Sequence, residues 1–581
     1  MSRWFVKKCS VTAKELVEFY GVGKPLAYAL YHRKIRNKAD IEKYVYMDNF
    51  PFEDIRNLSG VNNAFFIISE AIKNNKKIYI YGDYDADGVM STAIMYKGLS
   101  NLDADVHYFI PDRIEDGYGL NEKALQRLID EGAELIITCD NGISAINQIE
   151  LAVKNGIKVV VLDHHEPAFK EIDGVKKDII PIADAVVDAK IQNCGYSFTK
   201  MCAGGLCFRF ICGFYDYIGK KLENESELCE LAAVATVCDV VDLVGENRAI
   251  TARGMALMNS GSNNLGLKTL IFLKGIKNIT SYSVGFVIGP CINASGRLDS
   301  AKIAVELFTT DNAKRAFELA ESLNEFNEER KAITAESFER ISENIENSSI
   351  LNDKVIVVYD EKTHESVAGI IAGRIRERYN RPAIVLTKAE CGVKGSGRSV
   401  EKYDMFTALY NVKELLTKFG GHTMAAGLSM EEDNIALLRK RLNENCDIAL
   451  SDMEPILRAE TILDLRDICF ESVEELNILA PFGKANEKPL FGLKNIMATN
   501  IRFVGAKSNI VSFIITDGNK RVRAVDFDNC ECWLNWLNAN HYSSENYSQA
   551  IINIDGIFSL EINEYKEYKN PQIVMKDIKI Y

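Results

Sequence analysis

Short apolar runs alternate with amphipathic segments along the first part of the chain. From residue 77 onward, runs of four or five apolar residues are separated by segments with helical spacing. The apolar runs are Ile78–Tyr81, Val106–Ile110, Leu135–Thr138 and Val159–Leu162, and the helical segments are Val89–Leu99, Lys123–Ile129 and Ala145–Lys154. This alternation predicts a doubly wound parallel sheet of the α/β class, preceded by helices within residues 1–75.

The pattern changes between residues 311 and 350. This segment is rich in Glu, Ala, Lys and Arg and contains no Gly or Pro, which predicts one or two long solvated helices connecting two lobes. Leu and Ile do not sustain three heptads, which disfavours a coiled-coil partner helix. After residue 351 a second strand–helix alternation predicts a smaller α/β domain, with a Gly-rich loop at 394–399 and a helix over 404–418.

Beyond about residue 455 the pattern is one of short strands, several of which alternate apolar and polar residues. The runs are 501–504, 510–515, 522–527, 551–560 and 573–576, and they predict a small β-barrel or sandwich. We therefore expect four parts: a first α/β domain with a helical extension (1–310), connecting helices (311–350), a second domain (351–455) and a β-barrel domain (456–581).

Composition narrows the class of protein. The 581 residues carry 69 Lys and Arg against 82 Asp and Glu, a net charge of −13, which argues against a protein that coats nucleic acid but not against a basic cleft. Cys202, Cys207 and Cys212 are interpreted as core packing, and no Cys-x-x-Cys pair occurs among the 14 Cys. With no signal-peptide core and no apolar run long enough for a membrane helix, we expect a cytoplasmic protein that does not bind membranes.

Carboxylates and histidines follow the predicted parallel strands, at the edge where such sheets bind ligands. Asp83, Asp85 and Asp87 follow the first strand, Asp140 the third and Asp163-His164-His165 the fourth, while an apolar stretch at 231–238 leads to Asp239. A lone Asp after a strand is usually a helix N-cap, and an adjacent His pair is usually filler. Three alternating carboxylates, however, repel one another unless a cation neutralises them.

These side chains provide enough ligands for two divalent ions. Oxygen ligands with one or two imidazoles suit Mn²⁺ or Mg²⁺, and the absence of Cys from the set argues against structural zinc. The predicted metal ligands are Asp83, Asp85, Asp87, Asp140, His164 and Asp239. Two such ions bridged by a carboxylate form the standard arrangement for phosphoester hydrolysis.

The motifs resemble the DHH phosphoesterase superfamily and, within it, the RecJ family of single-strand-specific DNA exonucleases. Asp163-His164-His165 and the segment 82–88 carry the superfamily signature. Further segments that resemble the exonucleases are 112–120, 138–143, 239–243, 293–297, 395–399 and 419–422. The resemblance runs in order from residue 1 to about 430 and more loosely to the C-terminus, where it implies an oligonucleotide-binding (OB-like) barrel.

The resemblance implies roles for individual residues. Asp85 and Asp87 would hold one metal ion each, with Asp83 a further contributor, and Asp140 would bridge. His164 and Asp239 would complete one shell, so that the expected catalytic residues are His165, Asp140 and His164. His165 would donate to a phosphate oxygen or to the leaving group; the alternative is a filler at the strand end.

Basic groups of both lobes are expected to bind substrate. Arg113, Ser396 and Arg398 would hold a terminal 5′ phosphate, and Arg297 and His422 would add positive charge and an imidazole. Tyr118 is either a stacking platform for a base or a packed turn residue. Aromatic residues of the barrel are more often core, so we predict no binding residue there.

Some positions depart from the family pattern. Cys291 stands where the family often carries Arg, which removes one phosphate contact, and Asp112 and Ile114 replace a usual Asn and Phe. The metal ligands show no departure.

The expected activity is metal-dependent hydrolysis of single-stranded DNA from the 5′ end, releasing 5′-mononucleotides in DNA repair and recombination. Single-stranded DNA is the expected partner, with a single-strand-binding protein and a helicase, and the enzyme is expected to be a monomer. The alternatives are a DHH phosphodiesterase acting on short oligoribonucleotides or cyclic dinucleotides, and an inactive binding module. The length of the chain favours the exonuclease over a DHH phosphodiesterase for short substrates. The complete set of metal ligands disfavours an inactive binding module.

Overall fold

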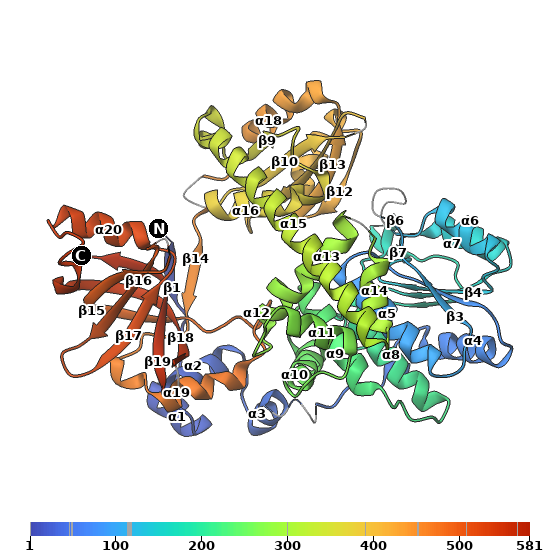
Figure 1. The fold of residues 1–581 in the computed structure, drawn as a ribbon, viewed down its shortest axis with the longest axis horizontal. Coiled ribbons are helices and arrows are strands. Elements are labelled where there is room, and N and C mark those ends of the chain that lie inside the picture. The colour runs from blue at the N-terminus through green and yellow to red at the C-terminus, as the bar shows by residue number, and fades with distance from the viewer. Residues whose placement is uncertain are drawn as a thin grey trace.

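The computed structural model describes residues 2–45, 47, 50–112, 119–172, 174–298, 300–389, 391–449, 453–506, 508–565 and 568–581. Figure 1 shows two lobes joined by a long helix, with a β-barrel domain beside them. Within these described ranges, no helix combines the length and the apolar character needed to cross a bilayer.

The first lobe is built on five parallel strands in the order β3-β2-β4-β5-β8. Their bounds are β2 Ile78–Tyr81, β3 Val106–Phe109, β4 Leu135–Cys139, β5 Lys158–Leu162 and β8 Ala185–Val187. The central strands β2 and β4 are buried throughout, as expected of a sheet covered on both faces. The predicted doubly wound sheet is confirmed, and β8 is a strand that the sequence pattern did not predict.

Helices cover both faces of this sheet because strand side chains alternate in direction. Ile78 and Ile80 belong to one large core, whereas Tyr79 and Tyr81 belong to a smaller core on the other face. The helices of the large core include α4 Val61–Lys73, α5 Ala86–Ser100, α8 Ala203–Tyr217 and α9 Glu225–Cys238; those of the smaller core are α6 Glu122–Asp130 and α7 Ile146–Lys154. The three cysteines 202, 207 and 212 lie at or in α8, packed in or against the large core, as predicted.

Further helices complete the first lobe and lead to the second. They are α10 Gly245–Asn259, α11 Leu265–Leu273, α12 Ser281–Ser283, α13 Gly289–Leu298 and α14 Lys302–Thr309, and an exposed hairpin joins β6 Ala168–Ile172 to β7 Val175–Ile179. The predicted connecting segment is one 34-residue helix, α15 Ala313–Glu346, capped by Asn312. It packs on α11, α13 and α14 in the first lobe and on α16 in the second, so its buried positions are explained without a coiled-coil partner.

The second lobe contains a five-stranded mixed sheet in the order β12-β13-β11-β10-β9. Its strands are β9 Ile356–Tyr359, β10 Ala383–Lys388, β11 Val393–Arg398, β12 Lys418–His422 and β13 Ala425–Met430, and its helices are α16 Glu365–Tyr379, α17 Met405–Tyr410 and α18 Ile435–Glu444. Two predictions were wrong here. The Gly-rich segment 394–399 is mostly strand β11, paired on both sides, and the predicted helix 404–418 ends at Tyr410.

The C-terminal domain is a closed barrel in the order β15-β16-β17-β19-β18, which confirms the predicted barrel. Its strands are β15 Phe491–Val504, β16 Ile510–Thr516, β17 Arg521–Asp526, β18 Ile552–Tyr565 and β19 Tyr568–Ile580, with helices α19 Phe470–Glu474 and α20 Cys530–Ala539. Phe513 and Trp533 pack together inside it with ring centroids 4.6 Å apart.

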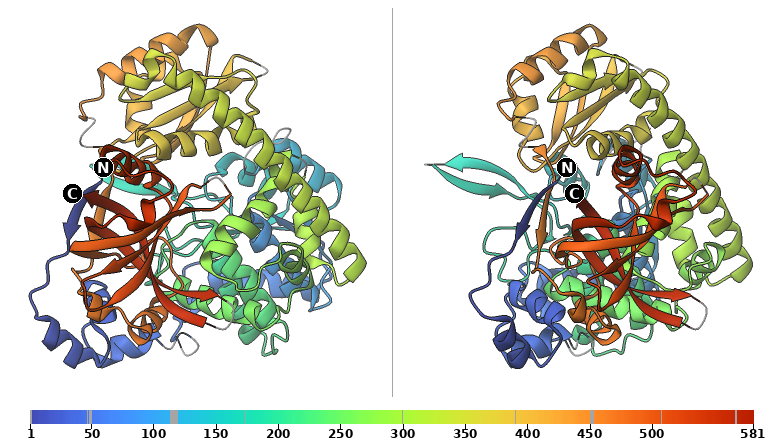
Figure 2. Two further views of the ribbon diagram at one scale, coloured as in Figure 1. Left: turned by 60° about the vertical axis from the view of Figure 1, so that its left-hand side comes forward. Right: turned by 90° about the vertical axis from the view of Figure 1, so that its left-hand side faces the viewer.

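The N-terminal segment packs on the barrel domain rather than on the first lobe's core. Strand β1 Arg3–Val6 pairs in parallel with β14 Ile456–Ala459, as Figure 2 shows. Leu26 and Leu30 of helix α2 belong to the same buried core as the barrel. The remaining helices of the segment are α1 Ala13–Tyr20 and α3 Lys38–Val45. The core packing therefore divides the predicted unit 1–310, because helical spacing reveals an apolar face but not the surface that it will contact.

Candidate metal centre and substrate cleft

Four parallel strands of the first lobe place acidic or imidazole side chains at one edge of the sheet. Asp83 follows β2, Asp140 follows β4, Asp163 follows β5, and Asp188 follows β8. All four carboxylates are at most 2% exposed. Asp140 has a φ of 65°, in the left-handed region that Asp and Asn tolerate better than most residues. The edge predicted from the sequence therefore exists, and β8 adds to it.

The first turn of α5 fixes Asp87. Asp85 caps this helix by accepting hydrogen bonds from the N–H groups of Asp87 and Gly88, both at 3.0 Å. Asp87 in turn accepts from the N–H groups of Ala203 and Gly204 at the start of α8, at 2.8 and 2.7 Å. A helix N-terminus stabilises an anion through these free donors, so the buried Asp87 carboxylate is held in one orientation.

Glycine is required where the first motif folds tightly. A Cβ on Gly88 would lie 2.6 Å from the carbonyl carbon of Asp83, and one on Gly296 would lie 2.6 Å from the carbonyl oxygen of Tyr84. Asn293, also on α13, accepts a hydrogen bond from the N–H of Ala86 at 2.8 Å. Helix α13 is thus packed directly against the loop that carries Asp83 and Asp85.

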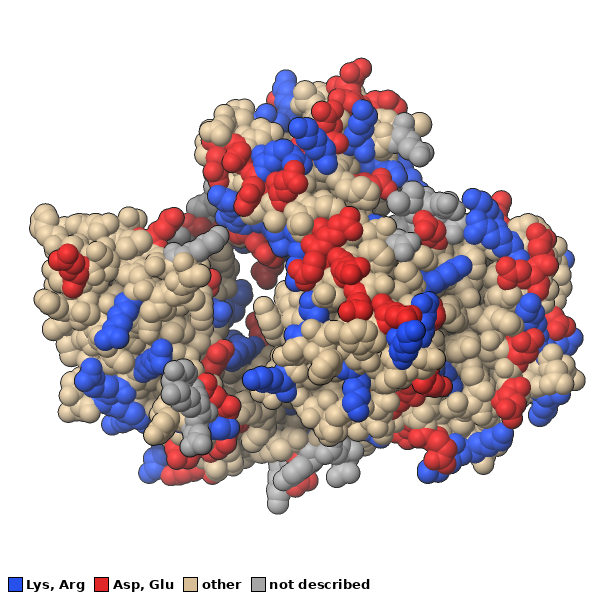
Figure 3. All heavy atoms as spheres, viewed as in Figure 1, with Lys and Arg blue, Asp and Glu red and all other residues tan. Residues whose placement is uncertain are grey.

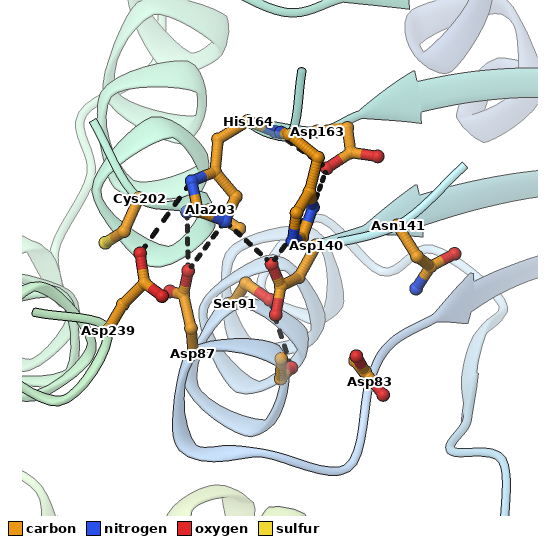
Figure 4. Close-up of polar contacts among 12 residues, drawn as sticks. Asp83, Asp87, Ser91, Asp140, Asn141, Asp163, His164, Cys202, Ala203 and Asp239 are labelled. Carbon is orange, nitrogen blue, oxygen red and sulfur yellow. Dashed lines mark hydrogen bonds and ion pairs between the residues drawn. The ribbon is translucent and has the colours of Figure 1, made fainter. Parts of the chain in front are cut away.

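His164 lies at the centre of the cluster (Figure 4). Its Nε2 is 3.1 Å from an Asp140 oxygen and 3.6 Å from an Asp87 oxygen, and its Nδ1 is 3.8 Å from an Asp239 oxygen. Asp239 follows the last residue of α9, so it comes from a helix end rather than a strand end.

Two groups of three potential ligands share His164. One consists of Asp87, His164 and Asp239, and the other of Asp140, His164 and His165, each with its ligand atoms within 4.8 Å of one another. Asp83 and Asp85, also predicted as ligands, belong to neither group, although the charges of both raise the pKa of Asp140.

The electrostatics of the cluster favour a cation. Burial and then repulsion from neighbouring carboxylates raise the pKa of Asp140 and Asp239, that of Asp239 to about 8. Burial also raises the pKa of Asp87, and it lowers the pKa of His164, which leaves that imidazole neutral near pH 7 with a lone pair for a metal. A divalent cation would replace the protons that these buried carboxylates otherwise bind, so the donor set fits two hard ions.

His165 differs from His164 because of Asp163. Burial lowers the pKa of His165, but the 2.8 Å hydrogen bond to Asp163 and the charge of that carboxylate raise it to about 9. Burial would raise the pKa of Asp163, yet the bond from His165 and the N–H of Ile143 hold it below its ordinary value. The His165 side chain is 43% exposed, so this imidazole is reachable from solvent while its Nδ1 lies 4.0 Å from an Asp140 oxygen.

Arg297 connects the metal lobe to the second lobe. It follows Gly296 on α13 and donates a hydrogen bond to the carbonyl of Ser366, in the first turn of α16. Two further predicted substrate residues, Arg113 and Tyr118, lie outside the described residues.

Strand β11 presents Ser396 and Arg398 on one face, because alternate residues of a strand point to the same side. Arg398 donates to Ser396 Oγ at 3.1 Å, and a Cβ on Gly369 of α16 would lie 2.9 Å from both side chains. Burial and the charge of Arg376 lower the pKa of Arg398.

His422 shares a row of the second sheet with Arg398. Both residues are in register with Ala425 of β13, which lies between their strands. Cross-strand partners point to the same side of a sheet, so His422 and Arg398 lie on one face, two strands apart. Because β11 is paired on both sides, its backbone N–H groups bond within the sheet and do not form the predicted phosphate-binding loop. The side chains of Ser396 and Arg398 remain candidates for binding phosphate.

The departure at Cys291 has a simple structural setting. The Cys291 side chain is fully buried and donates to the carbonyl of Val287 in its own helical stretch. Burial raises the pKa of Cys291, and the positive charge of Arg330 on α15 is among the charges that oppose this rise. Burial and, next to it, the charge of Arg374 on α16 lower the pKa of Arg330. Arg330 and Arg374 are basic groups near the junction of the lobes that the motifs did not single out.

Two acidic residues were also missed as site residues. Asp163 orients His165. It follows an apolar strand, as Asp140 does, so the pattern that identified Asp140 could also have identified Asp163. Asp188 follows the short run 185–187, and burial raises its pKa to about 8. A three-residue strand is too short to stand out by periodicity, so Asp188 escaped the prediction.

The fold and this site define a metal-dependent phosphoesterase of the DHH class. Residues 77–236 match the model of the DHH family, N-terminal domain, residues 352–447 match the DHHA1 domain, and residues 459–577 match the RecJ OB domain. The chain belongs to the RecJ family.

Curated relatives match along nearly the whole chain. The Single-stranded-DNA-specific exonuclease RecJ of Bacillus subtilis is 33% identical over 99% of this chain and 70% of the relative. That of Escherichia coli is 31% identical over 95% of this chain and 96% of the relative. The crystal structure of RecJ from Thermus thermophilus in complex with Mn²⁺ superposes with a TM-score of 0.80 at 26% identity, covering 99% of this chain and 79% of that one. A second structure of the same protein contains Mg²⁺. These matches confirm the resemblance read from the motifs.

Proposed function

We propose that this chain is a single-stranded-DNA-specific exonuclease that uses two divalent ions, Mn²⁺ or Mg²⁺, and degrades DNA from the 5′ end to 5′-mononucleotides. The observation that carries the proposal is the cluster of three carboxylates around His164, in which oxygens of Asp87, Asp140 and Asp239 lie within 3.8 Å of its ring nitrogens. We infer the substrate class from the family of this chain, because curated relatives are named as single-stranded-DNA-specific exonucleases.

Each residue of the cluster has a distinct task. Divalent ions bound there would acidify water and stabilise negative charge on the phosphoryl oxygens. Asp87, Asp140, His164 and Asp239 would hold them, with Asp83 and Asp85 adding negative charge around them. His165, protonated through its bond to Asp163, would donate to a phosphate oxygen or to the leaving oxygen.

The second lobe supports the polarity. Ser396 and Arg398 face α16, whose first turn contacts Arg297 of the metal lobe. A 5′ phosphate bound by these groups, with Arg113, His422 and a base on Tyr118, would place the first phosphodiester bond at the metal cluster. The four predicted domain units remain part of this proposal, with residues 2–45 assigned to the barrel side by their packing.

The barrel is proposed to bind the strand beyond the cleft, as OB folds do. We further propose that the protein acts as a monomer in the cytoplasm, in DNA repair and recombination, with a single-strand-binding protein and a helicase as partners.

Digestion of end-labelled strands tests the function. With Mn²⁺, a 5′-labelled single strand of DNA should release labelled mononucleotide first, whereas a 3′ label should stay on long products until late. A duplex of the same sequence and an RNA strand serve as controls. Release from the 3′ end first would reject the polarity, and a preference for short RNA would favour the oligoribonucleotide phosphodiesterase.

A further inference from the structure

A cavity of about 680 Å³ lies where the N-terminal segment, the first lobe and the C-terminal part of the chain meet. Its volume is in the range of sites for small organic ligands. Described residues between Lys7 and Phe50 form one wall, residues 243–248 another, and residues between 456 and 490 the third. None of the described lining residues belongs to the metal centre or to the predicted substrate cleft.

The lining is basic although the chain is acidic. Among the described residues that line the cavity, six are Lys or Arg and three are Asp or Glu, whereas the whole chain carries a net charge of −13. The basic residues are Lys7, Arg33, Lys43, Arg248, Arg458 and Lys488, and the acidic residues are Asp40, Glu460 and Glu487. Figure 3 shows Lys and Arg, together with Asp and Glu, at the surface around the opening between the barrel domain and the lobes.

Arg248 is the most unusual of these cations because it is 2% exposed. Its guanidinium donates to the carbonyl oxygens of Ile478 and Ala480, both at 2.8 Å, and to that of Tyr44, whereas its Nε has no hydrogen-bond partner among the described residues. Within the described part of the chain, no carboxylate lies at ion-pair distance from Arg248. A buried charge without a counter-ion is costly, so an anion in the cavity would stabilise it.

Two more cations of the lining lack a carboxylate partner among the described residues. Lys43 on α3 and Arg458 on β14 are both exposed side chains of the cavity wall. Next to them, the ring of Tyr44 lies with its centroid 3.7 Å from the guanidinium carbon of Arg248, and its hydroxyl donates to Asn486 at 2.9 Å. The cavity therefore combines positive charge with a fixed aromatic ring, which are the groups that bind a phosphate and a base.

We propose that this cavity is a nucleotide-phosphate binding site, distinct from the metal centre, in which Arg458 and Lys43 bind the phosphate and the buried charge of Arg248 adds to the positive potential. The nucleotide has two available sources, a free mononucleotide or a nucleotide of the DNA strand. The volume favours a single nucleotide.

Calorimetric titration of the full chain in EDTA tests the proposal. Thymidine 5′-monophosphate, thymidine and a short single-stranded oligothymidylate are titrated separately into the wild-type protein and into the variants Arg458→Glu and Lys43→Glu. Both residues are exposed and have no ion partner among the described residues, so folding should be retained. Arg248 is left intact because its bonds hold two segments together. Lys14→Glu is the matched control, because Lys14 lies on the same N-terminal segment outside the cavity with an 84% exposed side chain.

Each charge reversal should weaken binding of the monophosphate roughly tenfold or more, with Lys14→Glu unchanged and thymidine bound poorly throughout. Another outcome is that the oligonucleotide binds while the monophosphate does not. If Arg458→Glu and Lys43→Glu then weaken oligonucleotide binding and Lys14→Glu does not, the site takes its phosphate from the strand. Unchanged binding of both phosphate ligands in both variants would overturn the proposal. Binding in EDTA requires no hydrolysis, so a failure of the proposed exonuclease activity would be seen separately.

Discussion

At the scale of single residues, two adjacent histidines have pKa values shifted in opposite directions. Burial lowers the pKa of His164, whereas Asp163 raises the pKa of His165 to about 9. The sequence predicted both as site residues, together with Asp87, Asp140 and Asp239, because strand-end carboxylates identify the edge of a sheet. The family resemblance assigned His164 to a metal shell and His165 to the phosphate or the leaving group. The opposite pKa shifts of the two histidines could not be predicted from the sequence, because they depend on burial and on the hydrogen bond between His165 and Asp163.

Asp140→Asn should lower the turnover of single-stranded DNA by roughly 10²-fold or more while changing DNA affinity little. Asn keeps the shape of the side chain and tolerates the φ of 65° at this position, whereas Ala would add backbone strain. Asp103→Asn is the matched control, because Asp103 also has a positive φ of 55° and is exposed. Single-turnover kinetics and filter binding measure the two effects. Near-normal turnover in Asp140→Asn would reject Asp140 as a bridging ligand.

Arg398→Ala should raise the KM for a 5′-phosphorylated strand roughly tenfold and change that for a 5′-hydroxyl strand much less, because a charge-assisted hydrogen bond to phosphate is lost. Lys440→Ala, at an exposed position of the same lobe, is the control. Steady-state kinetics on the two matched substrates provide the comparison. An equal loss on both substrates would place Arg398 in a structural role rather than in phosphate recognition.

At the scale of elements, the hydrophobic period of a segment predicts whether it forms a helix or a strand more reliably than it predicts which element the segment packs against. The strands β2, β4 and β5 and the helix α15 were predictable because their patterns are long or fully apolar. Segment 394–399 looked like a loop because two glycines interrupt it, yet those glycines pack against Leu386 and Met405 inside a sheet. Tertiary pairing decided the conformation there, as it often does for strands.

Glu460→Gln should destabilise the docking of the N-terminal segment on the barrel domain by about 2–4 kcal/mol at pH 7. The Glu460 side chain, 4% exposed, lies 2.8 Å from Lys7 Nζ and 2.6 Å from His32 Nδ1. Burial raises its pKa, but the bonds from His32 and Lys7 hold it below its ordinary value. This stabilisation is therefore present above the unfolded pKa of about 4.3 and is lost as pH falls through the folded value.

Tryptophan fluorescence measures this effect selectively. The three Trp residues, Trp4, Trp533 and Trp536, all lie in β1 or in the barrel domain. Urea unfolding followed by this signal should show the difference between wild type and Glu460→Gln at pH 7 and a smaller difference near pH 3. Glu474→Gln, at an exposed position of α19, should match wild type. A difference that does not shrink in acid would contradict the ion-pair explanation.

At the scale of the whole molecule, strand β1 near the start of the chain pairs with β14, which leads into the barrel domain. Truncation experiments must therefore remove both parts together. Removing residues 456–581 alone would expose Leu26, Leu30 and the other apolar residues that share the barrel's core.

A chain lacking both residues 1–50 and 453–581 should be less prone to aggregation than one lacking residues 456–581 alone. The doubly truncated protein should bind long single strands more weakly than the full chain while cleaving short ones at a similar rate, since its metal centre and second lobe remain. Light scattering and oligonucleotide titrations measure the two effects. Unchanged affinity for long strands would argue against a DNA-binding barrel.

The parallel pairing of β1 with β14 also sets an order of events during biosynthesis. The ribosome makes Arg3 about 450 residues before its partner Ile456. At roughly 5–20 residues per second, this takes about 20–90 s. Throughout that interval the apolar face of α2 has no barrel to cover it, although the first lobe can already fold. The newly made segment that carries β1 and α2 is therefore a natural client for a chaperone that acts on nascent chains, and its docking is among the last steps of folding.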